Sequence, residues 1–298
     1  MPPYLGEDHA SALAFLGKAE SVLNKFTPAD GIETILASTD KIDIGHTAAK
    51  AAIDIALYDL IGKLQNRSCH ALFGSNTSRS IFTAYTIPMD EPEGIRLRIK
   101  EAEEYKLLKV KLGSENDKKI IEEIRKHTDK EILVDANEGW SNKEVALEMI
   151  HWLSERNVQM VEQPMPKEQL EETAWLTARS PIPILADEAV KRLSDIEKAK
   201  GVYSGINIKL MKCTGLHEAQ KMITRARQVG MKVMIGCMSE TTCGVSAAAQ
   251  LAPQVDWVDL DGPLLIKEDY FDGVKFREGK IILNDLPGIG VKPVAGLF

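Results

Sequence analysis

Cysteine is scarce in this chain, and its pattern excludes two classes of protein. There are four cysteines among 298 residues, and no two of them are spaced as Cys-x-x-Cys. Disulfide-stabilised small proteins and zinc-binding modules need cysteines at closer and more regular spacing. We therefore expect reduced, buried thiols at all four positions, which are Cys69, Cys213, Cys237 and Cys243.

Long hydrophobic runs and clustered positive charge are also missing. No apolar run approaches the roughly 20 residues that cross a bilayer, and the opening Met1-Pro2-Pro3-Tyr4 is unlike a signal peptide. The net charge is −7 and the lysines are dispersed among acids, whereas nucleic-acid binding needs clustered Lys and Arg. We expect a cytoplasmic protein with no nucleic-acid or membrane partner, and the sequence leaves a homo-oligomer open.

The hydrophobic residues that are present make up 44% of the chain, enough for one large core or two modest ones. Apolar residues at helical spacing predict helices over residues 9–25 and 47–64. After a polar break at residues 74–78, strands alternate with helices, which is typical of a parallel sheet built from βα units. The eight predicted strands cover residues 81–87, 107–112, 131–135, 159–163, 182–187, 205–210, 231–236 and 256–261.

Eight such strands predict an α/β fold, a (β/α)8 TIM-type barrel whose last unit is modified. A partial α+β capping domain, truncated at its N-terminus, accompanies it. We expect the mostly helical capping part over residues 1–79 and the barrel with the active site over residues 80–262. Residues 263–298, with short β-like runs at 273–276 and 280–283, are expected to return to the capping part.

Three acidic residues recur at the ends of successive apolar runs. Asp135, Glu162 and Asp187 are 27 and 25 residues apart, about the length of one strand and helix in such a barrel. Each acid then lies at the C-terminal end of a strand, where catalytic residues of these barrels collect. One such acid could merely cap the next helix, but three in the same place indicate a shared cation, and an all-oxygen set suits Mg²⁺.

Lysines stand on two strands at opposite sides of the predicted barrel. Lys109 and Lys111 are two residues apart, so both point to the interior, and Lys209 ends the sixth strand. Mg²⁺ on a substrate carboxylate stabilises an enediolate, and a lysine whose pKa is lowered by neighbouring positive charge can remove the adjacent proton. One lysine on each side of the carbon predicts 1,1-proton transfer, which is an epimerisation or racemisation.

These motifs together resemble the enolase superfamily, and within it the muconate-lactonising-type subgroup. The resemblance implies one Mg²⁺ on Asp135, Glu162 and Asp187, with Lys111 and Lys209 as the acid–base pair and Lys109 as an electrostatic helper. It runs from about residue 45 to the end and is carried by Ala51-Ala52-Ile53-Asp54-Ile55-Ala56-Leu57-Tyr58-Asp59-Leu60, Lys109-Val110-Lys111, Asp135-Ala136-Asn137, Glu162-Gln163-Pro164, Asp187-Glu188 and Asn207-Ile208-Lys209.

The histidines argue against another subgroup of this superfamily. The mandelate-racemase-type subgroup uses a histidine base near strand seven, but here that strand ends Ile235-Gly236-Cys237-Met238-Ser239 and no histidine ends a predicted strand. Acid-sugar dehydration is therefore disfavoured. Cys213-Thr214-Gly215 stands where the family usually ends in Gly-Gly, which we interpret as a tolerated loop change.

The eighth predicted strand indicates the substrate. Asp259 and Asp261 share one face at its end, across the barrel from strand four. A substrate with a carboxylate on the metal and an ammonium group at its far end would span the two sites, and a dipeptide has this form. The pair also resembles that of the dipeptide epimerases, where it is expected to bind the α-ammonium. The remaining residues expected to line the pocket are Thr86, Ser239 and Glu240, together with Tyr85.

Two alternatives stay open. o-Succinylbenzoate synthases and cycloisomerases of the subgroup share the lysines and acids, but their substrates carry no ammonium group. A catalytically silent binding protein without a lid is the alternative from another class. The lid matters because a family member should begin with β strands and a loop over the barrel mouth, whereas this chain is soon helical. We expect either a longer chain or a truncated protein with poor turnover, and an open edge on the runs at 273–276 and 280–283.

Overall fold

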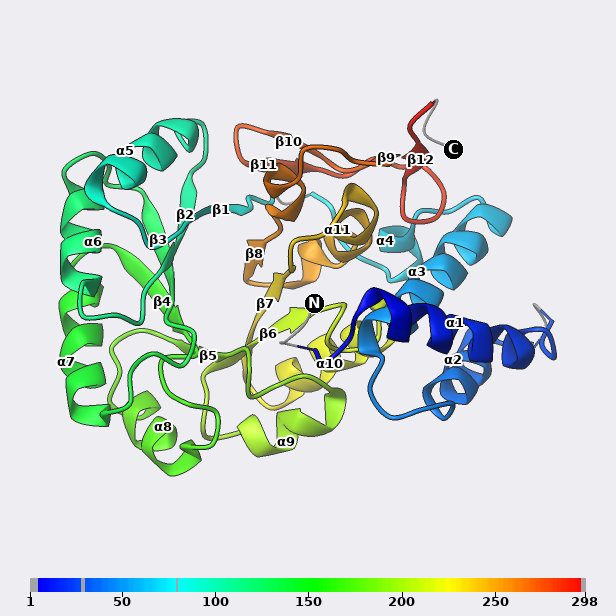
Figure 1. Cartoon of the computed structure of the whole chain (residues 1–298), viewed down its shortest axis with the longest axis horizontal. Coiled ribbons are helices and arrows are strands. Elements are labelled where there is room, and N and C mark those ends of the chain that lie inside the picture. The colour runs from blue at the N-terminus through cyan, green and yellow to red at the C-terminus, as the bar shows by residue number, and fades with distance from the viewer. Residues whose placement is uncertain (1–4, 28–29, 79, 296–298) are drawn as a thin grey trace.

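The computed structural model describes residues 5–27, 30–78 and 80–295, and its centre is one sheet of eight parallel strands in the order of the chain (Figure 1). The predicted (β/α)8 fold is confirmed, with all eight strands near their expected places. The strands are β1 (Ala84–Ile87), β2 (Leu107–Lys111), β3 (Glu131–Asp135), β4 (Val158–Glu162), β5 (Ile184–Ala186), β6 (Gly205–Lys209), β7 (Lys232–Gly236) and β8 (Trp257–Asp259).

Helices follow the strands and bury one face against the sheet. The longer ones are amphipathic, as in α10, where Leu216, Met222 and Ile223 are buried. The helices are α5 (Pro92–Glu101), α6 (Asp117–Arg125), α7 (Lys143–Ser154), α8 (Leu170–Thr177), α9 (Ile196–Ala199), α10 (Leu216–Gln228) and α11 (Thr242–Ala249), with 3₁₀ turns η2 (Leu193–Asp195), η3 (Ala252–Gln254) and η4 (Gly262–Leu265).

The first and last strands meet through side chains. Thr83 Oγ1 accepts a hydrogen bond from the Leu260 amide at 2.8 Å, and Asp261 Oδ2 accepts one from the Thr86 amide at 2.8 Å. The barrel is thereby nearly closed. A separate apolar cluster fills its interior below the strand ends and consists of Ala84, Leu107, Leu133, Met160, Leu185 and Met234, with Trp257 packed against it.

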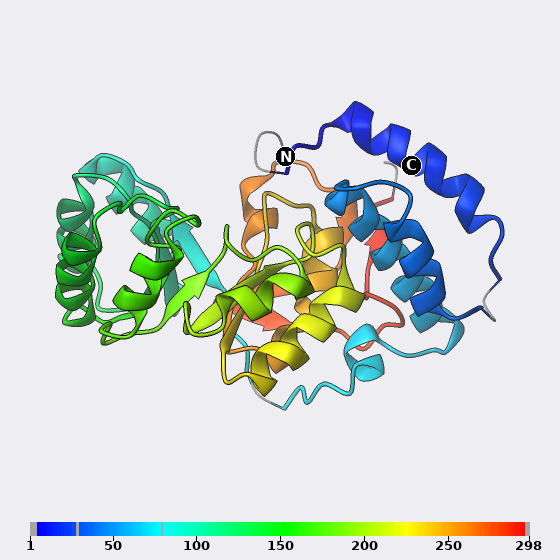
Figure 2. The same cartoon turned by 90° about the horizontal axis from the view of Figure 1, so that it is seen from below.

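The capping helices lie at the end of the molecule away from α5 to α8 (Figure 2). They are α1 (His9–Leu23), α2 (Ile32–Asp40), α3 (Thr47–Leu64) and α4 (Cys69–Leu72). Asp8 and Ser11 form a capping box at the start of α1. Phe15 of α1 and Ile53 of α3 belong to a small core of their own. None of the helices in the described residues has the length and apolar character of a membrane span.

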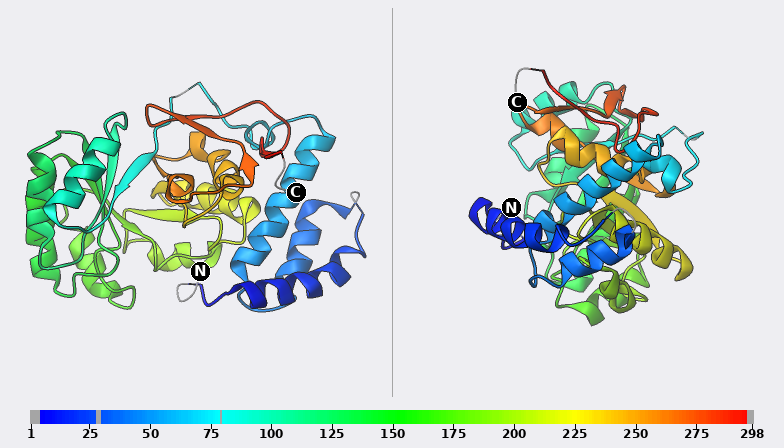
Figure 3. Two further views of the ribbon diagram at one scale, coloured as in Figure 1. Left: turned by 45° about the horizontal axis from the view of Figure 1, so that its top comes forward. Right: turned by 90° about the vertical axis from the view of Figure 1, so that its right-hand side faces the viewer.

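The C-terminal segment runs from the barrel back past the capping helices (Figure 3). Strand β10 (Lys275–Arg277) pairs with β11 (Lys280–Ile282), and β9 (Phe271–Asp272) pairs with β12 (Lys292–Pro293). The expected open edge is corrected for β11. Its second edge is bonded to residues 81–83, because the Ile281 amide donates to Ile81 and the Thr83 amide to Gly279, at 2.8 and 2.9 Å.

The tail also contacts the capping helices at close range. The Cys69 amide donates to the Gly288 carbonyl at 2.8 Å. A Cβ on Gly62 would lie 2.5 Å from Gly288 Cα, so the close approach requires glycine at position 62. All four cysteines are free thiols, as expected, but only Cys69 and Cys213 are fully buried, since Cys237 and Cys243 are partly exposed.

Candidate active site

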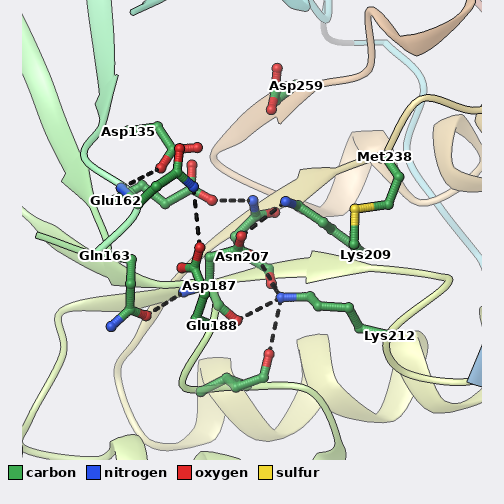
Figure 4. Close-up of polar contacts among 12 residues, drawn as sticks. Asp135, Glu162, Gln163, Asp187, Glu188, Asn207, Lys209, Lys212, Met238 and Asp259 are labelled. Atoms are coloured by element: carbon green, nitrogen blue, oxygen red, sulfur yellow. Dashed lines mark hydrogen bonds and ion pairs between the residues drawn. The ribbon is translucent and has the colours of Figure 1, made fainter. Parts of the chain in front are cut away.

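The strand register brings the predicted acids together inside the barrel. Lys111 pairs with Asp135, and Asp135 pairs with Glu162, across three neighbouring strands. Asp187 directly follows β5. All three carboxylates point inward and are at most 1% exposed. The acids that were predicted from a recurring spacing therefore form one buried cluster at the C-terminal rim (Figure 4).

Lys109 lies at the centre of this cluster. Its Nζ is 2.8 Å from Glu162 Oε2, 3.0 Å from Asp135 Oδ2 and 2.7 Å from Asp259 Oδ2. One ammonium group thus joins carboxylates from β3, β4 and β8. Burial opposes its charge, but Asp135 and the other two carboxylates outweigh burial and raise the pKa of Lys109 well above its usual value.

The two lysines of the predicted acid–base pair contact different carboxylates. Lys111 Nζ donates to Asp135 Oδ2 at 2.7 Å and to Asn137 Oδ1 at 3.0 Å. Lys209 Nζ donates to Asp187 Oδ2 at 2.9 Å. Burial alone would lower the pKa of Lys209, but its contact with Asp187 raises it. The lowered lysine pKa was expected from the positive charge of Lys109 beside Lys111 and of Mg²⁺, and it stays a prediction for the site with its cation.

A further buried lysine of this cluster, beside Lys109 and Lys209, was not predicted from the sequence. Lys212 is 1% exposed, and its Nζ donates to Asp187 Oδ1 at 2.5 Å and to the Asp187 carbonyl at 2.7 Å. The same Nζ reaches the Val190 and Asn207 carbonyls at 3.1 and 3.2 Å. The available signal was its position three residues after Lys209 in an otherwise apolar stretch.

The electrostatics of the carboxylates follow from these contacts. Burial would raise the pKa of Asp187, but the Lys209 and Lys212 ammonium groups hold it well below its usual range. Glu162 differs, because burial and the nearby charge of Asp135 raise its pKa. Burial and Asp187 likewise raise the pKa of Glu188 to about 7. The cluster therefore contains one carboxyl group with a lowered pKa, Asp187, and two with a raised pKa, Glu162 and Glu188.

The donor chemistry fits a hard divalent cation. Asp135, Glu162 and Asp187 offer only oxygens, the ligands that Mg²⁺ prefers, and Glu162 Oε2 is buried without a well-formed hydrogen bond. Across residues 5–27, 30–78 and 80–295, no acidic, His and Cys side chains stand in the arrangement of a formed metal site. Lysine ammonium groups contact the carboxylates instead. These three residues could hold Mg²⁺ in place of those contacts.

The predicted ammonium site includes a buried acceptor without a partner among the described residues. Asp259 is 5% exposed, and although its Oδ2 contacts Lys109, its Oδ1 has no hydrogen-bond partner among the described residues. Asp261 is also buried, and its Oδ2 accepts from the Thr86 amide. Burial and the neighbouring Asp259 raise the pKa of Asp261 to about 6. Asp259 therefore keeps a buried oxygen, Oδ1, that could accept from a ligand, whereas Asp261 Oδ2 already accepts from a backbone amide.

The remaining predicted pocket residues divide into inward and outward positions. Thr86 is beside Lys109 in the register of β1 and β2. Glu240 is buried and accepts from the Met238 amide at 2.8 Å, and burial raises its pKa to about 7, whereas Ser239 is exposed. Tyr85 was placed wrongly. Residues alternate along a strand, so it faces outward, where its hydroxyl donates to Glu101 of α5.

Two family models match this chain. Residues 95–295 match the model described as "Enolase C-terminal domain-like", and residues 20–74 match "Mandelate racemase / muconate lactonizing enzyme, N-terminal domain". The chain belongs to the enolase superfamily. The resemblance seen in the sequence is thereby confirmed.

Similar members of the superfamily include curated epimerases. The L-Ala-D/L-Glu epimerase of Bacteroides thetaiotaomicron is 52% identical over 295 residues, which are 99% of this chain and 76% of that protein. The Escherichia coli protein of the same name is 34% identical over 94% of this chain and 85% of its own length. The predicted class of enzyme, a racemase or epimerase among the isomerases, is confirmed.

Solved structures of this superfamily show the same fold. A substrate-liganded L-Ala-D/L-Glu epimerase from Bacillus subtilis has a TM-score of 0.92 at 28% identity, with 98% of this chain and 85% of that chain covered. The dipeptide epimerase from Enterococcus faecalis V583, complexed with Mg and L-Leu-L-Tyr, has a TM-score of 0.86 at 32% identity, with 97% and 84% covered.

Proposed function

We propose that this enolase-superfamily chain is an Mg²⁺-dependent dipeptide epimerase that moves one proton at the carbon next to the C-terminal carboxylate. The observation that carries the proposal is the buried cluster of Asp135, Glu162 and Asp187 with Lys111 and Lys209 on strands from different parts of the barrel. Solved relatives that hold Mg and a dipeptide support it.

The residues take distinct roles in this proposal. Asp135, Glu162 and Asp187 hold the cation, which when bound supplies positive charge to stabilise the enediolate form of the substrate. Lys111 and Lys209 remove and return the α-proton on opposite sides of the carbon, and Lys109 holds Asp259 beside the carboxylates. Asp259, with Asp261 beside it, binds the substrate ammonium, because Asp259 Oδ1 is a buried acceptor without a partner in the described residues.

We further propose the lining of the pocket, the division of the chain into parts and its location. The pocket lining also includes Thr86, Ser239 and Glu240. The division into residues 1–79, 80–262 and 263–298 is supported by the tail's bond to Cys69 of the capping part, and the tail also bonds to residues 81–83 of the barrel part. We also retain the cytoplasmic location.

One assay tests the reaction. The protein is incubated with Mg²⁺ and a panel of L,L- and L,D-dipeptides in D₂O, and mass spectrometry follows the products. We expect one deuteron at the α-carbon of the C-terminal residue together with inversion there. Absence of both in every dipeptide, despite ligand binding, would support the silent binding protein, and turnover of succinylbenzoate precursors alone would support a synthase.

Two controls isolate the roles of metal and ammonium group. Asp187→Asn should abolish turnover while the fold is retained, and near-native activity in EDTA would contradict the metal assignment. N-acetylation of the dipeptide should cost about 2 to 5 kcal/mol, the usual range when one partner of a buried charge pair is removed. Equal turnover of free and acetylated dipeptides would remove the role of Asp259 and Asp261.

A further inference from the structure

A buried glutamine connects the end of one strand to the acid that follows the next. Gln163 comes directly after Glu162 and is 0% exposed. Its Oε1 accepts a hydrogen bond from the Asp187 amide at 3.0 Å (Figure 4). The same oxygen accepts one from the Ala189 amide at 3.2 Å. The side chain therefore fixes the backbone on which the Asp187 carboxylate stands.

The nitrogen of the same side-chain amide is also hydrogen-bonded. Gln163 Nε2 donates to the Met165 carbonyl at 2.9 Å and to the Tyr203 hydroxyl at 3.0 Å. Both amide hydrogens and the amide oxygen are thus engaged, which orients the group in one way only. The backbone of Gln163 has φ of +36°, an unfavourable conformation that persists only where the surroundings hold it.

Lys212 holds the carboxylate of Asp187 from the opposite side. Its ammonium group donates to Oδ1 and to the carbonyl of Asp187, while Oδ2 accepts from Lys209. The backbone is fixed by Gln163 and one oxygen is fixed by Lys212. Both oxygens of the Asp187 carboxylate therefore accept from lysines, and its backbone is held by Gln163.

We propose that Gln163 is a positioning residue of the cation site, which fixes the backbone at Asp187 so that the Asp187 carboxylate is held in place for the divalent cation. The proposal rests on the proposed function for the cation itself. It assigns Gln163 no contact with the substrate or the metal. Partners that orient metal ligands in this way typically change metal affinity or activity about 10- to 100-fold when they are removed.

Gln163→Met is the test variant, since methionine has a similar length but cannot accept from the two amides. Gln250→Met is the matched control. Gln250 is also buried, its Oε1 accepts from the backbone and ring of His70 at 3.0 and 2.9 Å, and its Nε2 donates to the Ser246 and Ile289 carbonyls. The Gln250→Met variant therefore loses a similar set of buried hydrogen bonds, none of which goes to Asp135, Glu162 or Asp187.

Mn²⁺ affinity, measured by electron paramagnetic resonance without substrate, is the readout. We expect Gln163→Met to weaken Mn²⁺ binding about 10- to 100-fold and Gln250→Met to leave it unchanged, with similar losses of Tm in both. A further variant, Tyr203→Phe, removes one anchor of Gln163 and should weaken binding about two- to tenfold, so the test survives if Gln163→Met does not fold.

The outcomes separate the two proposals. Wild-type affinity for Mn²⁺ in folded Gln163→Met overturns the positioning role, as does unchanged affinity in Tyr203→Phe when Gln163→Met is unfolded. Equal weakening in Gln250→Met also overturns it, because the effect would then be a general loss of stability. Failure of the wild-type protein to bind Mn²⁺ would overturn the cation site and with it this role. Normal Mn²⁺ behaviour without dipeptide turnover would count against the substrate alone.

Discussion

Lys111 and Lys209 differ in the carboxylates that they contact, and this difference bears on their roles. Lys111 donates to Asp135 on β3, while Lys209 donates to Asp187 after β5. Lysines on different strands can approach one carbon from different sides. Each lysine would then serve one epimer of the substrate.

Replacing these lysines one at a time tests that geometry. Lys111→Ala and Lys209→Ala should each lose net epimerisation by at least about 100-fold, the lower end of the usual worth of a general acid or base. The lysine that remains should still exchange the α-proton of one epimer with D₂O, and the two variants should label opposite epimers. Proton NMR of separate L,L and L,D substrates reads this out, and labelling of the same epimer by both variants would contradict it.

At the scale of elements, α3 of the cap and α10 of the barrel are joined by Asp54. Its carboxylate accepts from the Leu216 amide at 2.5 Å and from the His217 amide at 3.1 Å, which caps the start of α10 from another part of the chain. Gly215 allows this approach, since a Cβ there would lie 2.3 Å from Asp54 Cγ. Burial nevertheless raises the pKa of Asp54 to about 7.

The raised pKa predicts a pH-dependent difference between the wild type and Asp54→Asn. The folded-state pKa is above the ordinary value of 3.8, so the stabilisation is present below about pH 4 and is lost as pH rises through about 7. Asparagine keeps one acceptor but does not titrate. The variant should be less stable than the wild type at pH 5. The difference between their free energies of unfolding should be smaller by about 2 kcal/mol at pH 8.

Urea denaturation at pH 5 and pH 8 measures that gap. The folded state binds more protons at Asp54 than the unfolded state does, so only the wild type loses stability from this residue between the two values. A gap that widened with pH would mean that the bonds to the α10 amides outweigh burial and hold Asp54 as an anion.

At the scale of the whole molecule, Arg192 connects the barrel to the capping helices. It donates to Glu218 of α10 through Nε and Nη2 at 2.8 and 2.7 Å, and Nη2 also donates to Asp40 at the end of α2 at 3.0 Å. Asp54 and Arg192 both line a cavity of about 210 Å³ between these parts. The position of the cap therefore depends on a few polar joints as well as on apolar packing.

Arg192→Met should loosen this joint. We expect a loss of about 1 to 3 kcal/mol in the free energy of unfolding, because two charge-assisted contacts are removed from a partly buried site. Arg225→Met, which removes a more exposed pair with Glu197, is the control and should cost clearly less. Urea denaturation measures both losses, and equal losses would show that Arg192 acts as an ordinary surface residue.

The sequence alone determined the barrel and several of the residues at the ends of its strands. Strand alternation has a period of two and the βα unit has a nearly constant length, so local pattern is enough to place Asp135, Glu162 and Asp187 at strand ends and Lys109 and Lys111 inside. The same alternation placed Thr86 inward, and applied strictly it would have turned Tyr85 outward.

Only the tertiary structure decided which of these groups touch. Lys212 reaching Asp187, Lys109 reaching Asp259, and Gln163 holding the 187–189 backbone all depend on the relative positions of different strands and on side-chain orientation. The contact of Lys209 with Asp187, which raises the pKa of Lys209, has the same origin. A charge responds to every neighbour in space, and strands distant in the sequence become neighbours only when the barrel closes.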